Sequence, residues 1–159
     1  MIRELRPDEY AAAAALIRAA FLTVAREFGL TEENCPRHTA FVASEARLNA
    51  QAGWGWRLYG SFDGEGLVGF ASISDAGGGA YEIHNLCVAP PARHRGLGAG
   101  LLRHCLGEAR GLGAERAVLS MIWENARLLA WYEAAGFALT GTERYPHLPF
   151  TVGRMERGV

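Results

Sequence analysis

Residues 81–112 constrain the fold most, because they read as a strand, a basic glycine-bearing turn and a helix. β-Branched, aromatic and apolar side chains over residues 81–88 predict the strand, and Pro90-Pro91 ends it because proline cannot donate to a ladder. Apolar residues then recur at four-residue spacing over residues 97–109, which predicts a helix with one buried stripe that ends near Gly111. This order of elements places a glycine-bearing turn at the start of a helix.

The turn over residues 93–98 has the sequence RHRGLG, which suits an anion. The first backbone N–H groups of a helix have no partner inside it, and the helix dipole adds about half a positive charge there. Gly96 and Gly98 lack a Cβ, so a bulky anion can approach the backbone. Arg93 and Arg95 add charged donors that match phosphate geometry. The turn therefore predicts a ligand with a phosphate or diphosphate group.

A dinucleotide fingerprint is the rival interpretation, since glycines 96, 98 and 100 alternate with other residues. That motif requires a tight turn directly after the strand and an acidic residue about 20 positions later, after the next strand. Here two prolines and two arginines lengthen the turn, and Glu115 stands before the next strand. The dinucleotide interpretation therefore fits poorly.

Two motifs resemble the signatures of the Gcn5-related N-acetyltransferase (GNAT) superfamily. The first, VAPPARHRGLG over residues 88–98, resembles its acyl-CoA signature, and the second places Asn125, Tyr132 and Gly136-Phe137 at the family's spacing. The resemblance implies an α/β fold with a mixed sheet of six to seven mostly antiparallel strands and about four helices. It also implies an enzyme that transfers an acetyl group from acetyl-CoA to a primary amine by direct attack on the thioester.

The same resemblance implies which residues hold the coenzyme. Backbone groups of Leu86, Cys87 and Val88 would run beside the pantetheine arm like an added strand, and Asn125 would contact that arm. Backbone amides of the turn would hold the diphosphate, a role that involves Arg93, His94, Arg95, Gly96, Leu97, Gly98 and Ala99. Acetyl-CoA is thus the expected cosubstrate, and no metal is expected.

Acetyl transfer to an amine benefits from an acid for the departing thiolate and a base for the amine. The resemblance implies Tyr132 as the acid. Glu82 stands eleven residues before Arg93, the register at which histone-type members carry a catalytic glutamate. His84 shares a strand face with Glu82, so either residue, or a water relay, could deprotonate the amine. A ribosomal-protein branch carries a glutamate five residues before the asparagine, where this chain has Ser120.

The acceptor is an amine on a small molecule or a peptide, and the sequence does not choose between them. In the family, the early helices and the last strands determine acceptor specificity. The resemblance therefore implies four candidate residues of the acceptor pocket, Trp54, Trp56, Tyr145 and His147. Packing in the core or at its rim is the alternative role for these side chains. An alternative function that is not enzymatic is a non-catalytic acyl-CoA-binding module with the same fold. A homodimer is possible, because homodimers are common in the family.

The rest of the chain reads as elements that complete one domain over residues 1–159. A strand is expected at residues 2–6, a helix at residues 8–28, and a second helix ending at Gly53, with Ala46 inward and Gln51 outward. Strands at residues 57–62 and 67–74 form a hairpin, and the glycine-rich residues 75–80 form a flexible loop. Later elements follow at residues 117–122, 125–135, 137–142 and 150–156. The order β-α-α-β-β-β-α-β-α-β-β gives a mixed sheet with helices on both faces.

Charge balance, cysteine content and the N-terminal segment indicate which partners and which compartment to expect. Lys and Arg number 16 against 17 for Asp and Glu, so a nucleic-acid or anionic-membrane partner is not expected. Three cysteines without paired metal spacing predict reduced thiols, and Cys87 is disfavoured as a nucleophile because a strand cysteine without a partner is typically inert. The N-terminal segment lacks an apolar signal core, and no stretch approaches the ~18 apolar residues of a membrane span. A cytoplasmic protein is expected.

Overall fold

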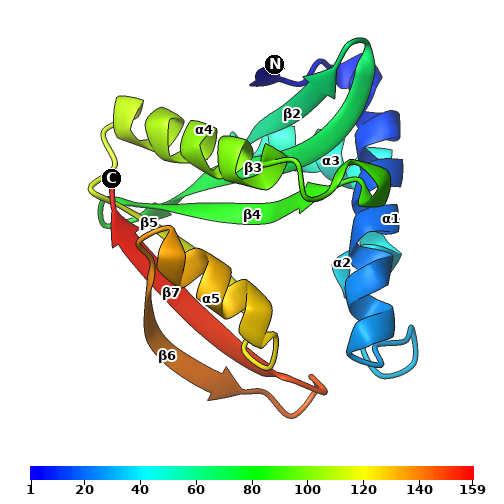
Figure 1. Ribbon diagram of the computed structural model, residues 1–159, viewed down its shortest axis with the longest axis vertical. Helices are drawn as coiled ribbons and strands as arrows, with labels where there is room; N and C mark the ends of the chain where they lie inside the picture. The colour runs from blue at the N-terminus through cyan, green and yellow to red at the C-terminus, as the bar shows by residue number, and fades with distance from the viewer.

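The computed structural model describes residues 1–159 and shows one seven-stranded sheet with the strand order β1-β2-β3-β4-β5-β7-β6 (Figure 1). The strands are β1 Ile2–Glu4, β2 Arg57–Asp63, β3 Gly66–Gly77, β4 Ala80–Val88, β5 Arg116–Ile122, β6 Ala138–Arg144 and β7 Thr151–Gly158. The helices are α1 Tyr10–Glu27, α2 Thr39–Val42, α3 Glu45–Gly53, α4 Leu97–Gly111 and α5 Ala126–Ala134, with 3-10 turns at Pro7–Glu9 and Pro90–Ala92. All neighbouring strands are antiparallel except β4 and β5. The expected mixed, mostly antiparallel sheet is confirmed.

Helices cover both faces of the sheet because alternate strand residues are apolar on both sides. On one face, Ile73 and Ile83 pack with Leu101 and Cys105 of α4 and with Tyr132 of α5. The opposite face carries a second core under α1 and α3, formed by residues that include Ile17, Leu48, Leu58, Phe70 and Cys87. β4 therefore lies between two cores, and its two faces contact different helices.

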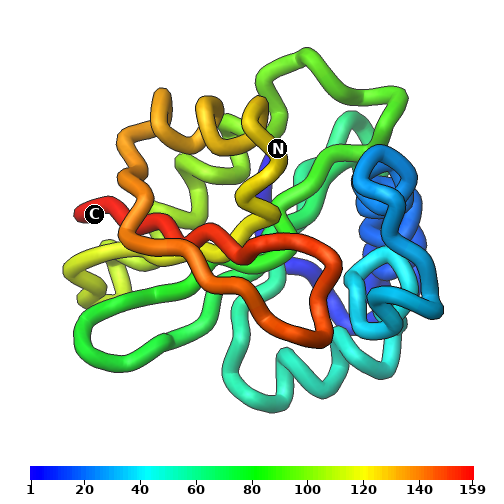
Figure 2. Tube along the Cα trace, turned by 90° about the horizontal axis from the view of Figure 1, so that it is seen from below, coloured from blue at the N-terminus to red at the C-terminus, as the bar shows by residue number.

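The α1–α2 connection and the β6–β7 connection lie next to each other, although they are far apart in the sequence (Figure 2). Leu30 and Cys35 of the first connection share a small core with Leu148 and Phe150 of the second. These contacts close one end of the molecule beside α1. None of the helices is long and apolar enough to cross a membrane.

The parallel pairing of β4 with β5 is short. Ala80 pairs with Arg116, Tyr81 with Ala117 and Glu82 with Val118, and no pairing continues beyond these positions. β4 runs on to Val88 while β5 follows β7 instead, so the two strands separate toward their C-terminal ends (Figure 1). The backbone of β4 after Glu82 is consequently unpaired on its β5 side.

A β-bulge interrupts β4 at Asn85 and Leu86. Phe70 of β3 pairs with Cys87 and Ser72 pairs with His84, so two residues of β4 stand opposite one residue of β3. Asn85 has a φ of 51°, in the left-handed region that few residues other than glycine adopt. Thr39 of α2 donates its hydroxyl hydrogen to Asn85 Oδ1 at 3.2 Å, which holds this side chain.

Two local expectations were wrong. The second helix is divided into α2 and α3, because Ala43 and Ser44 are extended and the Ser44 hydroxyl caps α3 by accepting from the Arg47 N–H. This break changes the helix phase, so Ala46 is exposed and Gln51 is buried, the reverse of the prediction. The expected loop at residues 75–80 is instead strand up to a tight turn at Gly78 and Gly79, whose φ angles of 60° and 80° suit a hairpin.

Candidate functional site

Two adjoining cavities lie along β4 where it separates from β5, and only the inner one is lined by β5. The outer groove has a volume of about 490 Å³ and lies among α1, the end of β4, the turn before α4 and the start of α5. The inner cavity has a volume of about 320 Å³ and extends from the same place toward β5. Both are lined by Phe21, Val24, Leu86, Asn125 and Leu128, so they adjoin along these residues, and we call the two together the cleft.

The turn before α4 presents a run of free backbone donors to the outer groove. The Ala92 and Arg93 N–H groups bond within the Pro90–Ala92 turn, and helical bonding resumes where the Gly100 N–H donates to the Gly96 carbonyl at 3.1 Å. The N–H groups between them, from residue 94 to residue 99, have no hydrogen-bond partner in the chain. Together with the dipole of the 15-residue helix α4, they form a site for an anion.

Glycine is required in this turn for two physical reasons. Gly96 has a φ of 77°, which strains any residue with a Cβ. At Gly98 the backbone is ordinary, but a Cβ would project between Trp131, Val88 and Leu86 at 3.7, 3.8 and 3.9 Å, on the groove wall. The missing side chain at Gly98 therefore keeps room for a ligand against the backbone.

The two arginines of the turn have other partners. Arg93 donates to the Ala20 carbonyl at 3.0 Å and to the Val88 carbonyl at 3.3 Å, which ties α1 to the end of β4. Arg95 forms an exposed ion pair with Asp63 at the end of β2, at 3.0 Å. Arg95 is the one predicted coenzyme residue that does not line the groove, where the structure places Leu86, Cys87, Val88, Arg93, His94, Gly96, Leu97, Gly98, Ala99 and Asn125.

Tyr132 and Asn125 face the cleft from α5. The Tyr132 ring is buried against Phe137 and Trp131, with ring centroids at 5.6 and 5.0 Å, and the residue lines the inner cavity. Burial raises the pKa of Tyr132 above its ordinary value, so the phenol stays protonated at neutral pH. Asn125 caps α5, because its Oδ1 accepts from the Leu128 N–H at 3.2 Å, and this leaves its NH₂ group for a ligand.

Glu82 and His84 lie together on the other face of β4. His84 Nδ1 is 3.1 Å from Glu82 Oε2, His84 Nε2 is 2.8 Å from the Ser74 hydroxyl, and Trp56 stacks on the imidazole at 4.1 Å. Burial lowers the pKa of His84 to about 4 and raises that of Glu82 above its ordinary value. The imidazole is therefore neutral at pH 7, and both of its nitrogens are held by neighbours.

The other residues singled out from the sequence fall into distinct places. Ser120 lines the inner cavity, so a hydroxyl stands where one branch of the family has a carboxylate. Trp54 is exposed beside Trp56, and Tyr145 and His147 contact each other on the exposed β6–β7 connection. Burial raises the pKa of Cys87 to about 12, which keeps its thiol protonated.

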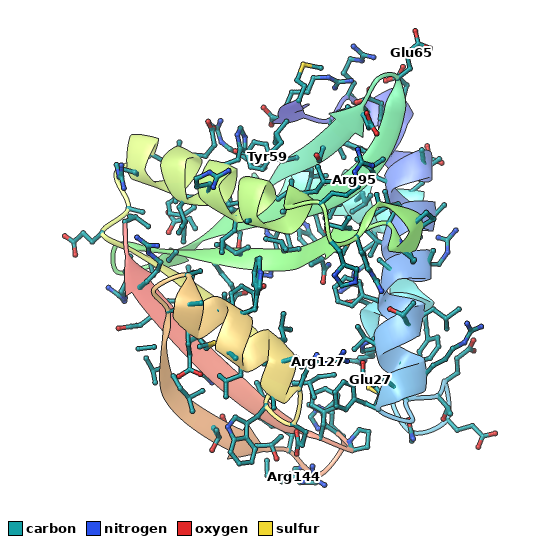
Figure 3. The ribbon with its side chains drawn as sticks, in the orientation of Figure 1. Glu27, Tyr59, Glu65, Arg95, Arg127 and Arg144 are labelled. Carbon is teal, nitrogen blue, oxygen red and sulfur yellow. The ribbon has the colours of Figure 1, made fainter.

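Sequence reasoning missed the bulge at Asn85 and an ion pair across the cleft. Arg127 at the start of α5 contacts Glu27 at the end of α1 at 2.5 Å, so the pair bridges the two helices that flank the outer groove (Figure 3). No sequence signal identifies either feature. Arg127 and Glu27 are 100 positions apart, and Asn85 sits in an otherwise ordinary strand pattern.

The geometry agrees with known proteins at the level of family and fold. The model of the acetyltransferase (GNAT) family matches residues 15–137. A solved PaiA N-acetyltransferase from Thermoplasma acidophilum in complex with coenzyme A aligns with a TM-score of 0.83 at 19% identity, covering 100% of this chain and 98% of that chain. A ribosomal-protein-S18-alanine N-acetyltransferase from Escherichia coli aligns with a TM-score of 0.77 at 21% identity, covering 100% and 93%.

Similar sequences bear acetyltransferase names. N-alpha-acetyltransferase RimI of Mycobacterium tuberculosis is 39% identical over 88 residues, and mycothiol acetyltransferase of Beutenbergia cavernae is 33% identical over 108 residues. These matches cover 54% and 64% of this chain but only 54% and 36% of the two relatives, so the chain spans about half or less of their length. The family model, in contrast, extends over most of the chain. The chain therefore belongs to the acetyltransferase (GNAT) family.

Proposed function

We propose that the protein is an acetyl-CoA-dependent N-acetyltransferase, in which an acceptor amine attacks the bound thioester directly. The observation that carries the proposal is the row of unpartnered N–H groups over residues 94–99. These groups face the outer groove, which adjoins the inner cavity that Tyr132 lines. Anionic oxygens at the start of a helix are stabilised by hydrogen bonds from the free N–H groups and by the positive end of the helix dipole. A diphosphate at the turn would direct the rest of the coenzyme along β4.

The unpaired side of β4 supplies the next contacts. Backbone groups from Leu86 to Val88 would pair with the amides of the pantetheine arm, as an added strand pairs with a sheet. The bulge at Asn85 turns the backbone at the point where the outer groove meets the inner cavity, which is where the thioester would lie. The Asn125 NH₂ group would contact the same arm from the opposite wall.

Proton transfer is assigned to residues on the two sides of β4. The amine nitrogen forms its bond to the acetyl carbon as the C–S bond breaks, and Tyr132 gives its proton to the departing sulfur. The burial that keeps Tyr132 protonated also disfavours a thiolate in the cavity, so the sulfur needs that proton. The amine loses its own proton to Glu82 or His84 through water, because neither side chain lines the inner cavity and both nitrogens of His84 already have partners. The phenolate is reprotonated from solvent.

The test is thiol release from acetyl-CoA in the presence of a panel of amines, with the Tyr132→Phe variant for comparison. Phenylalanine keeps the ring contacts with Phe137 and Trp131, so coenzyme A affinity should not change. Loss of the acid should lower kcat by about 10²- to 10⁴-fold. Full activity of this variant across pH removes Tyr132 from its role. Coenzyme A binding without turnover of any amine would instead indicate a non-catalytic acyl-CoA-binding module.

A further inference from the structure

A third cavity, of about 170 Å³, lies on the other side of β4, between this strand and helices α1, α2 and α3. We call it the arginine cavity, after Arg37 and Arg47 in its lining. Thr39 and Asn85 line both the arginine cavity and the inner cavity. These two residues, joined by their 3.2 Å hydrogen bond, are thus a shared wall between the arginine cavity and the proposed reaction centre.

The lining of the arginine cavity is positively charged. Arg37 and Arg47 are both exposed, and the side chains of both lack an ion pair or hydrogen bond in the chain. No carboxylate lines this cavity. His84 adds no charge at pH 7, because its neutral imidazole is held between Glu82 and Ser74. Two guanidinium groups at one small cavity favour a carboxylate or another planar anion.

Gln51 gives an independent sign that a ligand binds here. Its side chain lines the cavity, the residue is 3% exposed, and its Oε1 has no hydrogen-bond partner in the chain. A buried amide oxygen without a donor destabilises the folded protein, so such groups are rare and call for an explanation. Because Gln51 Oε1 is buried, the side chain would have to rotate toward a bound N–H or O–H group to gain the missing donor.

We propose that the arginine cavity recognises the acceptor, and that the acceptor is a small amino carboxylate. Its carboxylate would lie between Arg37 and Arg47, and a donor on the same molecule would bond the turned Gln51 side chain. Its amine would replace the Thr39–Asn85 hydrogen bond and so reach the inner cavity. The volume equals five or six water molecules at ~30 Å³ each, which suits an amino-acid-sized molecule and not a polypeptide segment. Polycationic amines are disfavoured by the two arginines. This inference rests on the proposed function.

The first experiment compares matched acceptors. Glycine, alanine, serine, β-alanine and 4-aminobutyrate are each paired with the corresponding amide, and kcat/KM is measured by thiol release from acetyl-CoA. The carboxylate member of at least one pair should be preferred by about 10- to 100-fold, the range for a hydrogen bond to a charged group. Equal or better use of the amide throughout the panel overturns the inference and leaves the proposed function intact.

The second experiment tests the residues. Arg47→Gln should raise KM for the preferred carboxylate about 10- to 100-fold and so remove the preference for the carboxylate over its amide, while KM for acetyl-CoA stays unchanged. Arg26→Gln, an exposed arginine on α1 outside the cavity, is the matched control and should have no effect. Gln51→Leu should lower acceptor affinity by about fivefold and raise the melting temperature, because it removes an unpartnered buried oxygen. An Arg47→Gln variant with unchanged KM contradicts the proposal.

Direct binding separates this inference from the proposed function. The same amino carboxylates are titrated by calorimetry into the protein saturated with coenzyme A, which cannot donate an acetyl group. Binding that weakens in Arg47→Gln but not in Arg26→Gln supports the arginine cavity even where no amine is acetylated. No detectable binding of any of these carboxylates at millimolar concentration overturns the inference, whatever the outcome of the acetylation assays.

Discussion

Replacing Gly98 with alanine should weaken the binding of coenzyme A without lowering the stability of the fold. The added Cβ would meet Trp131, Val88 and Leu86 at 3.7 to 3.9 Å, which are ordinary contacts, so the fold should accept it. Glycine in a helix is destabilising relative to alanine by roughly 0.5–1 kcal/mol, so the free energy of unfolding should stay equal or increase slightly. The same methyl group would lie on the groove wall and block close approach to the Gly98 N–H. Loss of one hydrogen bond to a charged oxygen costs about 1.5–3 kcal/mol, or about a 10- to 100-fold weaker Kd for coenzyme A.

The assay pairs calorimetric titration of coenzyme A with urea unfolding, using Gly107→Ala as the matched control. Gly107 is also in α4, is exposed and has no atom within 4 Å of a built Cβ, so this variant should become more stable without losing affinity. Equal coenzyme A affinities for the Gly98 and Gly107 variants would refute the placement of the diphosphate at the start of α4. A Gly98→Ala variant that unfolds far more easily would refute the geometry of the groove wall.

Three further predictions concern stability and reactivity. Asn85 has a φ of 51°, so in urea titrations the Asn85→Gly variant should have a free energy of unfolding about 1 kcal/mol higher than that of Asn85→Ala. Equal free energies for the two variants would contradict the left-handed backbone at the bulge. Because burial lowers the pKa of His84 to about 4, from about 6.5 when unfolded, stability should fall by about 2–3 kcal/mol as pH drops from 6.5 to 4; this fall should shrink in His84→Gln. Burial raises the pKa of Cys87 and Cys105 to about 12, so these thiols should react with Ellman's reagent at pH 8 only after unfolding, and rapid labelling of native Cys87 would contradict this.

The turn at residues 88–98 could be predicted because local chemistry determines it. Pro90 and Pro91 end β4 whatever lies around them, and glycine at position 96 permits a left-handed conformation that starts the next helix. The free N–H groups follow from helix geometry alone. The family resemblance then placed Tyr132 and Asn125, which the structure brings to the same cleft.

Features that depend on tertiary contacts were not predictable in this way. The break between α2 and α3 at Ala43 and Ser44 interrupts a segment of high helix propensity, and it reverses which side of α3 is buried. Gln51 was therefore expected on the surface but is buried at the arginine cavity. The separation of β4 from β5 likewise reflects how the two halves of the sheet pack on their helices, which no strand pattern encodes.

The separation of β4 from β5 after Glu82 bears on how the protein avoids aggregation. Unpaired strand backbone at the rim of a sheet recruits strands from other molecules and promotes aggregation. In this fold the outermost strands are the three-residue β1 and the solvent-exposed β6, whereas the long unpaired stretch of β4 is enclosed by α1 and α5. The unpaired backbone of β4 can therefore bond a ligand that carries amide groups, while α1 and α5 keep it from pairing with strands of other molecules.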